Sequence, residues 1–181
     1  MSLHPPAHLP VGPDLLLRWD EPSDASLLAS AVAGALDHLR PWMPWATPEA
    51  ATEQAQAARL AELEDKRRAG TDYAYVLLPA EGGGLLGVVG LHRRVGPEAI
   101  ELGYWLMPAA TGRGLMTRAV QALTVAALAL DDVSRVEIHC DVANARSAAV
   151  AERAGYRLDR VEDKEAAAPA ETGRSMIWLR T

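Results

Sequence analysis

Hydrophobic and polar positions alternate with two different periods along this chain, and each change of period marks a change of element. Residues 115–129 form a long, almost uncharged stretch that predicts a buried helix. Shorter apolar runs bounded by glycine, proline or acidic residues predict strands. The pattern predicts helices at 24–39, 47–69, 115–129 and 145–154. It predicts strands at 14–19, 73–78, 85–94, 100–106, 135–142, 156–162 and 174–180.

Local signals set the predicted boundaries. Asp24 is a plausible N-cap for the first helix, which ends before Pro41 because the residue preceding a proline avoids helical geometry. Thr47 followed by Pro48 predicts the start of the second helix, and Gly70 its end. The two strands around the glycine-rich turn at 81–84 then form an antiparallel hairpin.

Alternation assigns side chains to the faces of two predicted strands. In strand 100–106, Glu101, Gly103 and Trp105 share a face, and the glycine leaves space beside the carboxylate. The opposite face carries Ile100, Leu102, Tyr104 and Leu106. In strand 135–142, Glu137 and His139 share a face, whereas Cys140 points to the other side and is assigned to the core.

Length and composition indicate one domain spanning residues 1–181, with Pro-rich residues 1–13 as a flexible N-terminal extension. The net charge of −6 argues against a nucleic-acid partner and is compatible with a cationic one, such as an amine. One cysteine excludes an internal disulfide framework and indicates a reducing cytoplasm. We find no secretion signal, no membrane span and no metal-ligand spacing among the five histidines.

Candidate chemistry begins at Gly112-Arg113-Gly114, the turn between strand 100–106 and helix 115–129. Such a turn presents backbone N–H groups and the positive end of a helix dipole to a phosphate. A P-loop would end in Gly-Lys-Ser/Thr, but Leu115 and Met116 follow Gly114. A dinucleotide fingerprint would need a third small residue where Thr117 stands. A plain connecting turn stays open as an alternative.

The order of elements, and three segments, resemble the GNAT superfamily of acetyl-CoA-dependent N-acetyltransferases. The segments HLRPWMPW (38–45), ELGYWL (101–106) and NARSAAVAERAGY (144–156) are similar to the RimJ/RimL-like branch, which acetylates ribosomal-protein N-termini. The resemblance implies an α/β (α+β) fold. Its centre would be a GNAT-like mixed, mostly antiparallel, twisted sheet of about seven strands, flanked by about four helices and split where the cofactor enters.

The resemblance also implies a site for acetyl-CoA. The pyrophosphate loop maps onto Thr111, Gly112, Arg113, Gly114, Leu115 and Met116. Thr111 and Met116 depart from the family pattern, and we expect the Met116 side chain to turn toward the core. Arg113 and Arg118 either contact phosphate or are solvated. Leu106 and Met107 would pair through their backbone with the amide-rich arm of the cofactor, and Asn144 would bond that arm or cap the following helix.

The expected chemistry is attack of a neutral amine on a thioester, with a backbone N–H near Leu106 stabilising the oxyanion. Glu101 is the candidate base, for which a raised pKa would be the signature; the alternative is that it pairs with a cation or an arginine. Glu137 and His139 are secondary candidates, for each of which pairing on the strand face is the favoured alternative. Ser147 matches the residue that this branch uses to protonate the departing thiolate, whereas Ala151 stands where many relatives carry a tyrosine.

The substrate side would involve Trp42 and Trp45, which either wall the acceptor site or pack between helices. We therefore expect an N-acetyltransferase that acts on a primary amine by direct transfer in a ternary complex, with a protein N-terminal α-amine as the preferred acceptor. A small amine such as an antibiotic or polyamine is the first alternative. A non-catalytic CoA-binding regulatory module and a protein-interaction domain are alternatives of other classes. The expected enzyme is cytoplasmic, contacts neither nucleic acid nor membrane, and is compatible with a homodimer.

Overall fold

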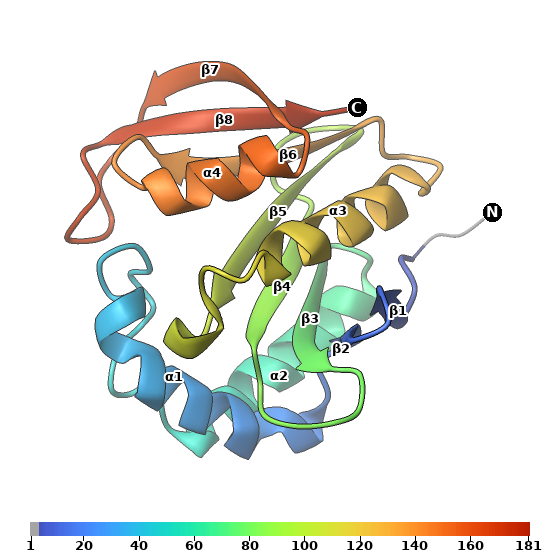
Figure 1. Ribbon diagram of the computed structural model, residues 1–181, viewed down its shortest axis with the longest axis vertical. Coiled ribbons are helices and arrows are strands. Elements are labelled where there is room, and N and C mark those ends of the chain that lie inside the picture. The colour runs from blue at the N-terminus through green and yellow to red at the C-terminus, as the bar shows by residue number, and fades with distance from the viewer. Residues whose placement is uncertain (1–3) are drawn as a thin grey trace.

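One continuous mixed sheet lies at the centre of the molecule (Figure 1). The computed structural model describes residues 4–181, and within them eight strands follow the spatial order β1-β2-β3-β4-β5-β6-β8-β7. The strands are β1 (His8–Val11), β2 (Leu15–Trp19), β3 (Asp72–Pro79), β4 (Gly87–His92), β5 (Ala99–Leu106), β6 (Arg135–Asp141), β7 (Arg157–Asp163) and β8 (Arg174–Arg180). All neighbouring pairs are antiparallel except β5 and β6, which are parallel.

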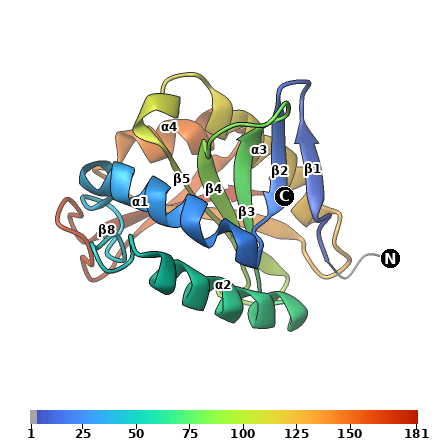
Figure 2. The same ribbon diagram turned by 90° about the horizontal axis from the view of Figure 1, so that it is seen from below.

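The helices cover both faces of this sheet. They are α1 (Ala25–Leu39), α2 (Glu53–Arg68), α3 (Leu115–Leu128) and α4 (Ala145–Arg153). Helices α1 and α2 lie over one face, and α3 and α4 lie over the other (Figure 2). The predicted mixed, mostly antiparallel fold is therefore confirmed, with eight strands in the described chain rather than about seven.

Alternation in the strands sorts side chains between the two faces as the sequence predicts. Ile100 and Leu102 of β5 are almost fully buried and pack in the core under α3. Glu101, Gly103 and Trp105 point to the face of α1 and α2, and Trp105 packs against the smaller clusters there. Polar groups on β5 consequently face a different layer from the main core.

Strands β5 and β6 pair over only a short length. Parallel register joins Ala99–Glu101 to Arg135–Glu137, yet β5 continues to Leu106 and β6 to Asp141. Beyond Glu101 the two strands diverge (Figure 1), so the second half of β5 pairs with β4 alone. The divergence opens the sheet in its middle.

The N-terminal region corrects one expectation. Residues 1–13 were predicted to be a flexible extension, but His8–Val11 form β1 and pair with β2. Pro10 is tolerated because β1 is an edge strand, where a missing N–H need not break a ladder bond. Residues 1–3 of the predicted extension lie outside the described residues.

The second helix begins later than predicted. Turns occupy the segment after Thr47, and α2 starts at Glu53. The side chain of Thr52 accepts a hydrogen bond from the N–H of Ala55 and so caps the helix. Pro48 could have opened a helix, but the later threonine provides the side-chain cap.

A carboxylate is buried between β2 and α2. Asp20 is 2% exposed and lies 3.7 Å from Arg59 Nη1 and 3.5 Å from Arg67 Nη1. Its Oδ2 atom has no hydrogen-bond partner among the described residues. Burial raises the pKa of Asp20 to about 6, although both arginines favour the charged form.

We expect Asp20→Asn to stabilise the protein at pH 8 and to lose this advantage toward pH 4. The folded pKa lies above the unfolded one, so the contribution of Asp20 to stability is fully present below about pH 4 and is lost as the pH rises through about 6. A shift of this size corresponds to about 3 kcal/mol. Denaturant unfolding of both proteins between pH 4 and 8 measures the difference. The same substitution at exposed Asp37 is the control, and equal pH slopes for wild type and Asp20→Asn would contradict the prediction.

Candidate functional site

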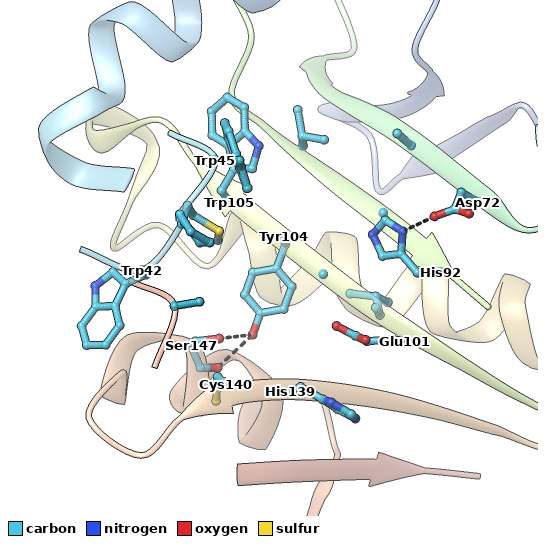
Figure 3. A pocket seen from close by; sticks show the side chains of 18 of the residues that line it. Trp42, Trp45, Asp72, His92, Glu101, Tyr104, Trp105, His139, Cys140 and Ser147 are labelled. Carbon is cyan, nitrogen blue, oxygen red and sulfur yellow. Dashed lines mark hydrogen bonds and ion pairs between the residues drawn. The ribbon is translucent and has the colours of Figure 1, made fainter. Parts of the chain in front are cut away.

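A cavity of about 890 Å³ extends from beneath α1 and α2 to the gap between β5 and β6 (Figure 3). Its walls come from both helices, from the loop after α1, from β3 to β6 and from the start of α4. The cavity reaches most of the residues that the sequence singled out for acceptor binding and catalysis. The divergence of β5 and β6 therefore joins the face covered by α1 and α2 to the N-terminus of α4.

Ionisable side chains lie in one row across β3, β4, β5 and β6, and those on β3, β4 and β5 line this cavity. By strand register, Asp72 on β3 lies opposite His92 on β4, His92 lies opposite Glu101 on β5, and Glu101 lies opposite Glu137 on β6. Opposite residues on neighbouring strands share a face and lie close enough to interact. The row ends where β5 and β6 separate, so it borders the gap.

Glu101 is held by an arginine that the sequence analysis did not identify. Arg94 donates from Nε and from Nη2 to the two carboxylate oxygens of Glu101, each at 2.7 Å. Burial favours the neutral carboxyl, but these bonds and the nearby positive charges hold the pKa of Glu101 below its usual value. The prediction of a raised pKa is wrong. The structure instead shows the arginine pair that was the alternative.

Glu137 and His139 are also paired on the strand face, as the sequence analysis considered. Arg135 Nε donates to Glu137 Oε1 at 2.9 Å, and His139 Nε2 lies 2.7 Å from Oε2. Burial opposes the charge, yet these two partners lower the pKa of Glu137. The negative charge of Glu137 is thus shared between two cationic or polar groups.

Ser147 lies at the first turn of α4, on the other side of the gap. The Oδ1 atom of Asn144 accepts a bond from Ser147 N at 3.1 Å, so Asn144 caps α4. Tyr104 Oη lies 2.9 Å from the carbonyl oxygen of Ser147 and 3.0 Å from its Oγ (Figure 3). Burial raises the pKa of the Tyr104 hydroxyl, which therefore stays protonated and can donate.

Tyr104 and Cys140 complete this side of the site. Alternation placed Tyr104 with the core residues of β5, and it reaches Ser147 only because the sheet opens next to it. The contact could not be predicted from the sequence, because it depends on where β5 and β6 separate. Cys140 is 7% exposed and lines the cavity, and burial raises the pKa of its thiol. It stays a neutral thiol, consistent with its assignment to the core rather than to catalysis.

The glycine turn leads into α3 with its backbone groups exposed. Gly112 and Gly114 have φ values of 74° and 71°, a conformation that other residues rarely adopt. No side chain in the described part of the chain caps the N-terminus of α3. Backbone N–H groups at this end therefore stay available to an anion.

The residues around the turn are either buried, exposed or hydrogen-bonded to other parts of the chain. Met116 is 2% exposed and packs in the main core, which confirms the expected direction of its side chain. Leu115 is buried as well, and Arg113 is exposed beside the turn. Arg118 is not available for phosphate, because it donates to Asp14 and to the carbonyl of Val11. Thr111 bonds the carbonyl of Pro108 through its hydroxyl.

At the end of β5, Leu106 and Met107 present different backbone groups. The N–H of Met107 donates to the carbonyl of Leu86, on the β4 side. Successive residues of a strand direct their backbone groups to opposite sides, so Leu106 directs its N–H and C=O to the gap. Of these two predicted residues, only Leu106 is placed to pair there with an extended ligand.

Three tryptophans form the apolar end of the cavity. Trp45 is 42% exposed and its ring lies 6.3 Å from that of Trp105, tilted by 53°. Trp42 lines the same cavity from the loop after α1 (Figure 3). Trp42 and Trp45 were candidates from sequence, whereas Trp105 was noted only for its position on β5. All three are wall residues rather than a plug between α1 and α2.

The sheet divided between parallel strands, with an uncapped helix start beside the gap, defines an N-acetyltransferase of the GNAT class. Residues 14–157 match the family model described as acetyltransferase (GNAT) domain, and the chain belongs to this family. A curated relative is the putative ribosomal N-acetyltransferase YdaF of Bacillus subtilis (strain 168). It is 31% identical over 151 residues, which cover 81% of this chain and 79% of YdaF.

Solved structures show the same fold. RimL, a ribosomal-protein α-N-acetyltransferase in complex with coenzyme A, has a TM-score of 0.85 and 23% identity, covering 96% of this chain and 97% of that one. The Microcin C7 self-immunity acetyltransferase MccE, in complex with acetyl-CoA and AMP, has a TM-score of 0.87 and 19% identity, covering 97% of each chain. No helix in residues 4–181 has the length and apolar character needed to cross a bilayer.

We expect Arg94→Gln to raise the pKa of Glu101, because burial remains while the arginine is removed. A lowered pKa stabilises the fold above the ordinary pKa of glutamate, and that contribution disappears as the pH falls through the folded value. Arg94→Gln should therefore destabilise the protein at pH 7 but not at pH 3. Side-chain carboxyl NMR titration, with Glu101→Gln for assignment, measures the shift. Arg135→Gln is the matched control, since Arg135 pairs with Glu137 and bonds the carbonyls of Val95 and Pro97 but forms no bond to Glu101; an unmoved Glu101 titration in Arg94→Gln would refute the prediction.

Proposed function

We propose that this protein transfers the acetyl group of acetyl-CoA to a primary amine, by direct attack within a ternary complex, and that its preferred acceptor is a protein N-terminal α-amine. The observation that carries the proposal is the cavity that runs through the divided sheet from the acceptor face to Ser147. Such a cavity lets two substrates meet inside the protein. The names of YdaF and RimL, both ribosomal acetyltransferases, support the choice of acceptor.

The residues of the gap fit acetyl-CoA. The uncapped start of α3, with Gly112, Arg113 and Gly114, offers N–H donors and a positive charge to a pyrophosphate. Leu106 directs its backbone groups into the gap and would pair with the amide-rich arm. Because the methionine side chain of Met116 is buried in the core, it leaves the approach to the helix start open. The departures from the family pattern therefore do not block the site.

Acetyl-CoA supplies a thioester, on whose oxygen negative charge develops during attack. The N–H of Leu106 is the stabilising donor that we assign to this oxygen. Ser147 is assigned to the departing sulfur, to which its hydroxyl donates a hydrogen. Tyr104 donates to the carbonyl oxygen of Ser147 and so positions the residue that carries this hydroxyl. Asn144 caps α4 by accepting from the backbone N–H of Ser147 and so holds the same residue in place.

The acceptor enters on the face of α1 and α2, where Trp42, Trp45 and Trp105 form an apolar wall. An α-amine with a pKa of about 7.7–8.0 is roughly one-tenth neutral at pH 7, whereas a lysine amine near 10.4 is far less so. An N-terminal amine thus needs less assistance from the enzyme. Glu101, bound at both oxygens by Arg94, contributes a fixed charge beside this entrance and not a free base.

A small-molecule acceptor is the second candidate. MccE, which shares the fold, was solved with AMP as well as acetyl-CoA. The exposed Trp45 ring beside Trp105 offers an aromatic surface on which a planar group would stack. A ribosomal-protein acceptor would place the reaction in the cytoplasm, whereas a small acceptor would leave this open.

Binding and thiol release together test the proposal. Calorimetry with acetyl-CoA should show binding at micromolar to millimolar ligand, and thiol release should then follow on a panel of amines. The panel holds peptides with free α-amines, the same peptides with blocked α-amines and a free lysine, and small amines. Release only with free α-amines supports the preferred acceptor. Release only with small amines supports the second candidate, and binding without release on any amine would replace the enzyme by a regulatory CoA-binding module.

Ser147→Ala should lower kcat by about tenfold to a hundredfold while acetyl-CoA binds as in the wild type. The donor is lost, but CoA thiolate, with a thiol pKa of about 8.5, leaves without complete protonation. Steady-state kinetics and calorimetry measure the two quantities. Tyr104→Phe should give a smaller loss, because Ser147 keeps its hydroxyl and its bond to Asn144. An unchanged kcat in Ser147→Ala would remove Ser147 from the mechanism.

A further inference from the structure

Asp72 and His92 form a hydrogen-bonded pair on the acceptor side of the cavity to which the proposed function gives no role. His92 Nδ1 lies 2.7 Å from Asp72 Oδ1 (Figure 3). A carboxylate accepts a hydrogen at this nitrogen, so the neutral ring carries its proton on Nδ1 and leaves Nε2 as an acceptor. The pair is therefore oriented to receive a proton at Nε2.

Two facing glycines make room around Nε2. Gly90 on β4 and Gly103 on β5 are cross-strand partners next to His92 and Glu101. A Cβ atom on Gly90 would lie 2.7 Å from His92 Nε2, and one on Gly103 would lie 3.8 Å from it. The imidazole therefore occupies space that exists because Gly90 lacks a side chain, whereas a Cβ on Gly103 would only be in van der Waals contact with it. All three residues line the cavity, and the His92 side chain is 24% exposed.

The other carboxylates of the row are already bound by arginine. The Asp72–His92 pair differs from them in this respect. Both oxygens of Glu101 accept from Arg94. His139 also lines the cavity, but its partner Glu137 shares its charge with Arg135. Asp72 has His92 as its only ion-pair partner among residues 4–181. An imidazolium at position 92 would thus pair with a carboxylate that forms no other ion pair among these residues.

The other charged groups near His92 come from the segment after β4, from α2 and from β5. Arg94 follows β4 and lies close enough to Asp72 to respond to its charge. Glu62 and Lys66 of α2 line the same cavity and carry opposite charges. Glu101 faces His92 from β5. None of these groups forms an ion pair with the imidazole among the described contacts, so Asp72 is its direct electrostatic partner.

We propose that His92 is the proton acceptor for the incoming amine, acting directly or through one water, and that Asp72 is the residue that positions it. This inference rests on the proposed acetyl transfer. An acceptor arriving on the face of α1 and α2 passes over Gly90 and Gly103, where Nε2 meets it. Imidazole suits the task because its ordinary pKa, about 6.5, lies near neutral pH.

The proton balance is simple. An N–H bond of the ammonium breaks and an N–H bond forms at His92 Nε2. The freed lone pair attacks the thioester carbonyl carbon, and the C–S bond then breaks. The nitrogen loses a second proton as the amide forms, and the sulfur gains one. Overall, ammonium and thioester give amide, thiol and one proton, which leaves Nε2 for solvent.

The pH dependence of His92→Gln separates this role from a structural one. Glutamine keeps a donor for Asp72 but cannot take up a proton. In the wild type, kcat/KM for an α-amine peptide should depend less on pH than the neutral fraction of the amine does, because Nε2 removes the ammonium proton. In His92→Gln it should instead follow the neutral amine, with a loss of about tenfold at pH 7 that shrinks to less than about twofold by pH 9. A loss of the same size at every pH, or no loss, would overturn the proposal.

Three further variants are measured by the same pH dependence of kcat/KM. Gly90→Ala should reproduce part of the loss, because the new Cβ displaces the imidazole end, and His38→Gln, outside the cavity, should behave as wild type. His139→Gln is the rival: if its profile moves and that of His92→Gln does not, the proton acceptor is His139 and the proposal is wrong. Acetyl-CoA calorimetry on each variant confirms that the cofactor site is intact.

A readout without turnover completes the test. Long-range ¹H–¹⁵N spectra of the free protein should show neutral His92 as the Nδ1–H tautomer, and Asp72→Asn should shift the imidazole titration. An Nε2–H tautomer would overturn the inference whatever the activity. A wild type that neither binds acetyl-CoA nor releases thiol would instead defeat the proposed function itself. An active wild type with unmoved His92→Gln profiles would defeat only the role of His92.

Discussion

The short parallel pairing of β5 with β6 is the constraint on which the rest of this structure depends. Hydrogen bonding between the two strands stops at Glu101, although apolar residues of both strands continue to pack under α3. The core therefore holds the strands at their base while their outer halves separate. In the outer half of β5, the backbone groups that face the gap lack a partner strand. Unpaired backbone groups are costly in a protein unless something else bonds them, and a ligand that crosses the sheet would occupy this place.

The same divergence divides the chemistry between the two halves of the sheet. Ionisable groups of β3, β4 and β5 lie on the face of α1 and α2, and the cap of α4 lies across the gap. Buried acids persist there because each has a positively charged or hydrogen-bonding neighbour. That pairing also determines which groups remain reactive: Arg94 occupies Glu101, whereas the imidazole of His92 keeps one nitrogen toward the cavity.

Most elements of the fold could be predicted from sequence because they depend on local patterns. The strand alternation, the glycine turn and the helix ends at Gly70 and Gly155 are all readable within a few residues. Contacts that depend on strand register were not predictable. Arg94 lies two residues after the end of β4, and in the sequence it was only the last residue of a predicted strand. Tyr104 could not be distinguished from a core residue. The proline-rich segment can form β1 because β1 lies at the edge of the sheet, and this position was likewise not predictable.

The ion pair of Arg118 with Asp14 has a consequence for how the molecule holds its anion-binding turn. Arg118 lies one helical turn after Gly114, and it is fastened both to Asp14 and to the carbonyl of Val11. The N-terminal hairpin therefore acts as a brace for the first turn of α3. A truncation at residue 13, which composition alone would recommend as the removal of a tail, would cut one support of that brace. Strand β1 therefore belongs to the packed domain, through its pairing with β2 and through the bond from Arg118 to Val11.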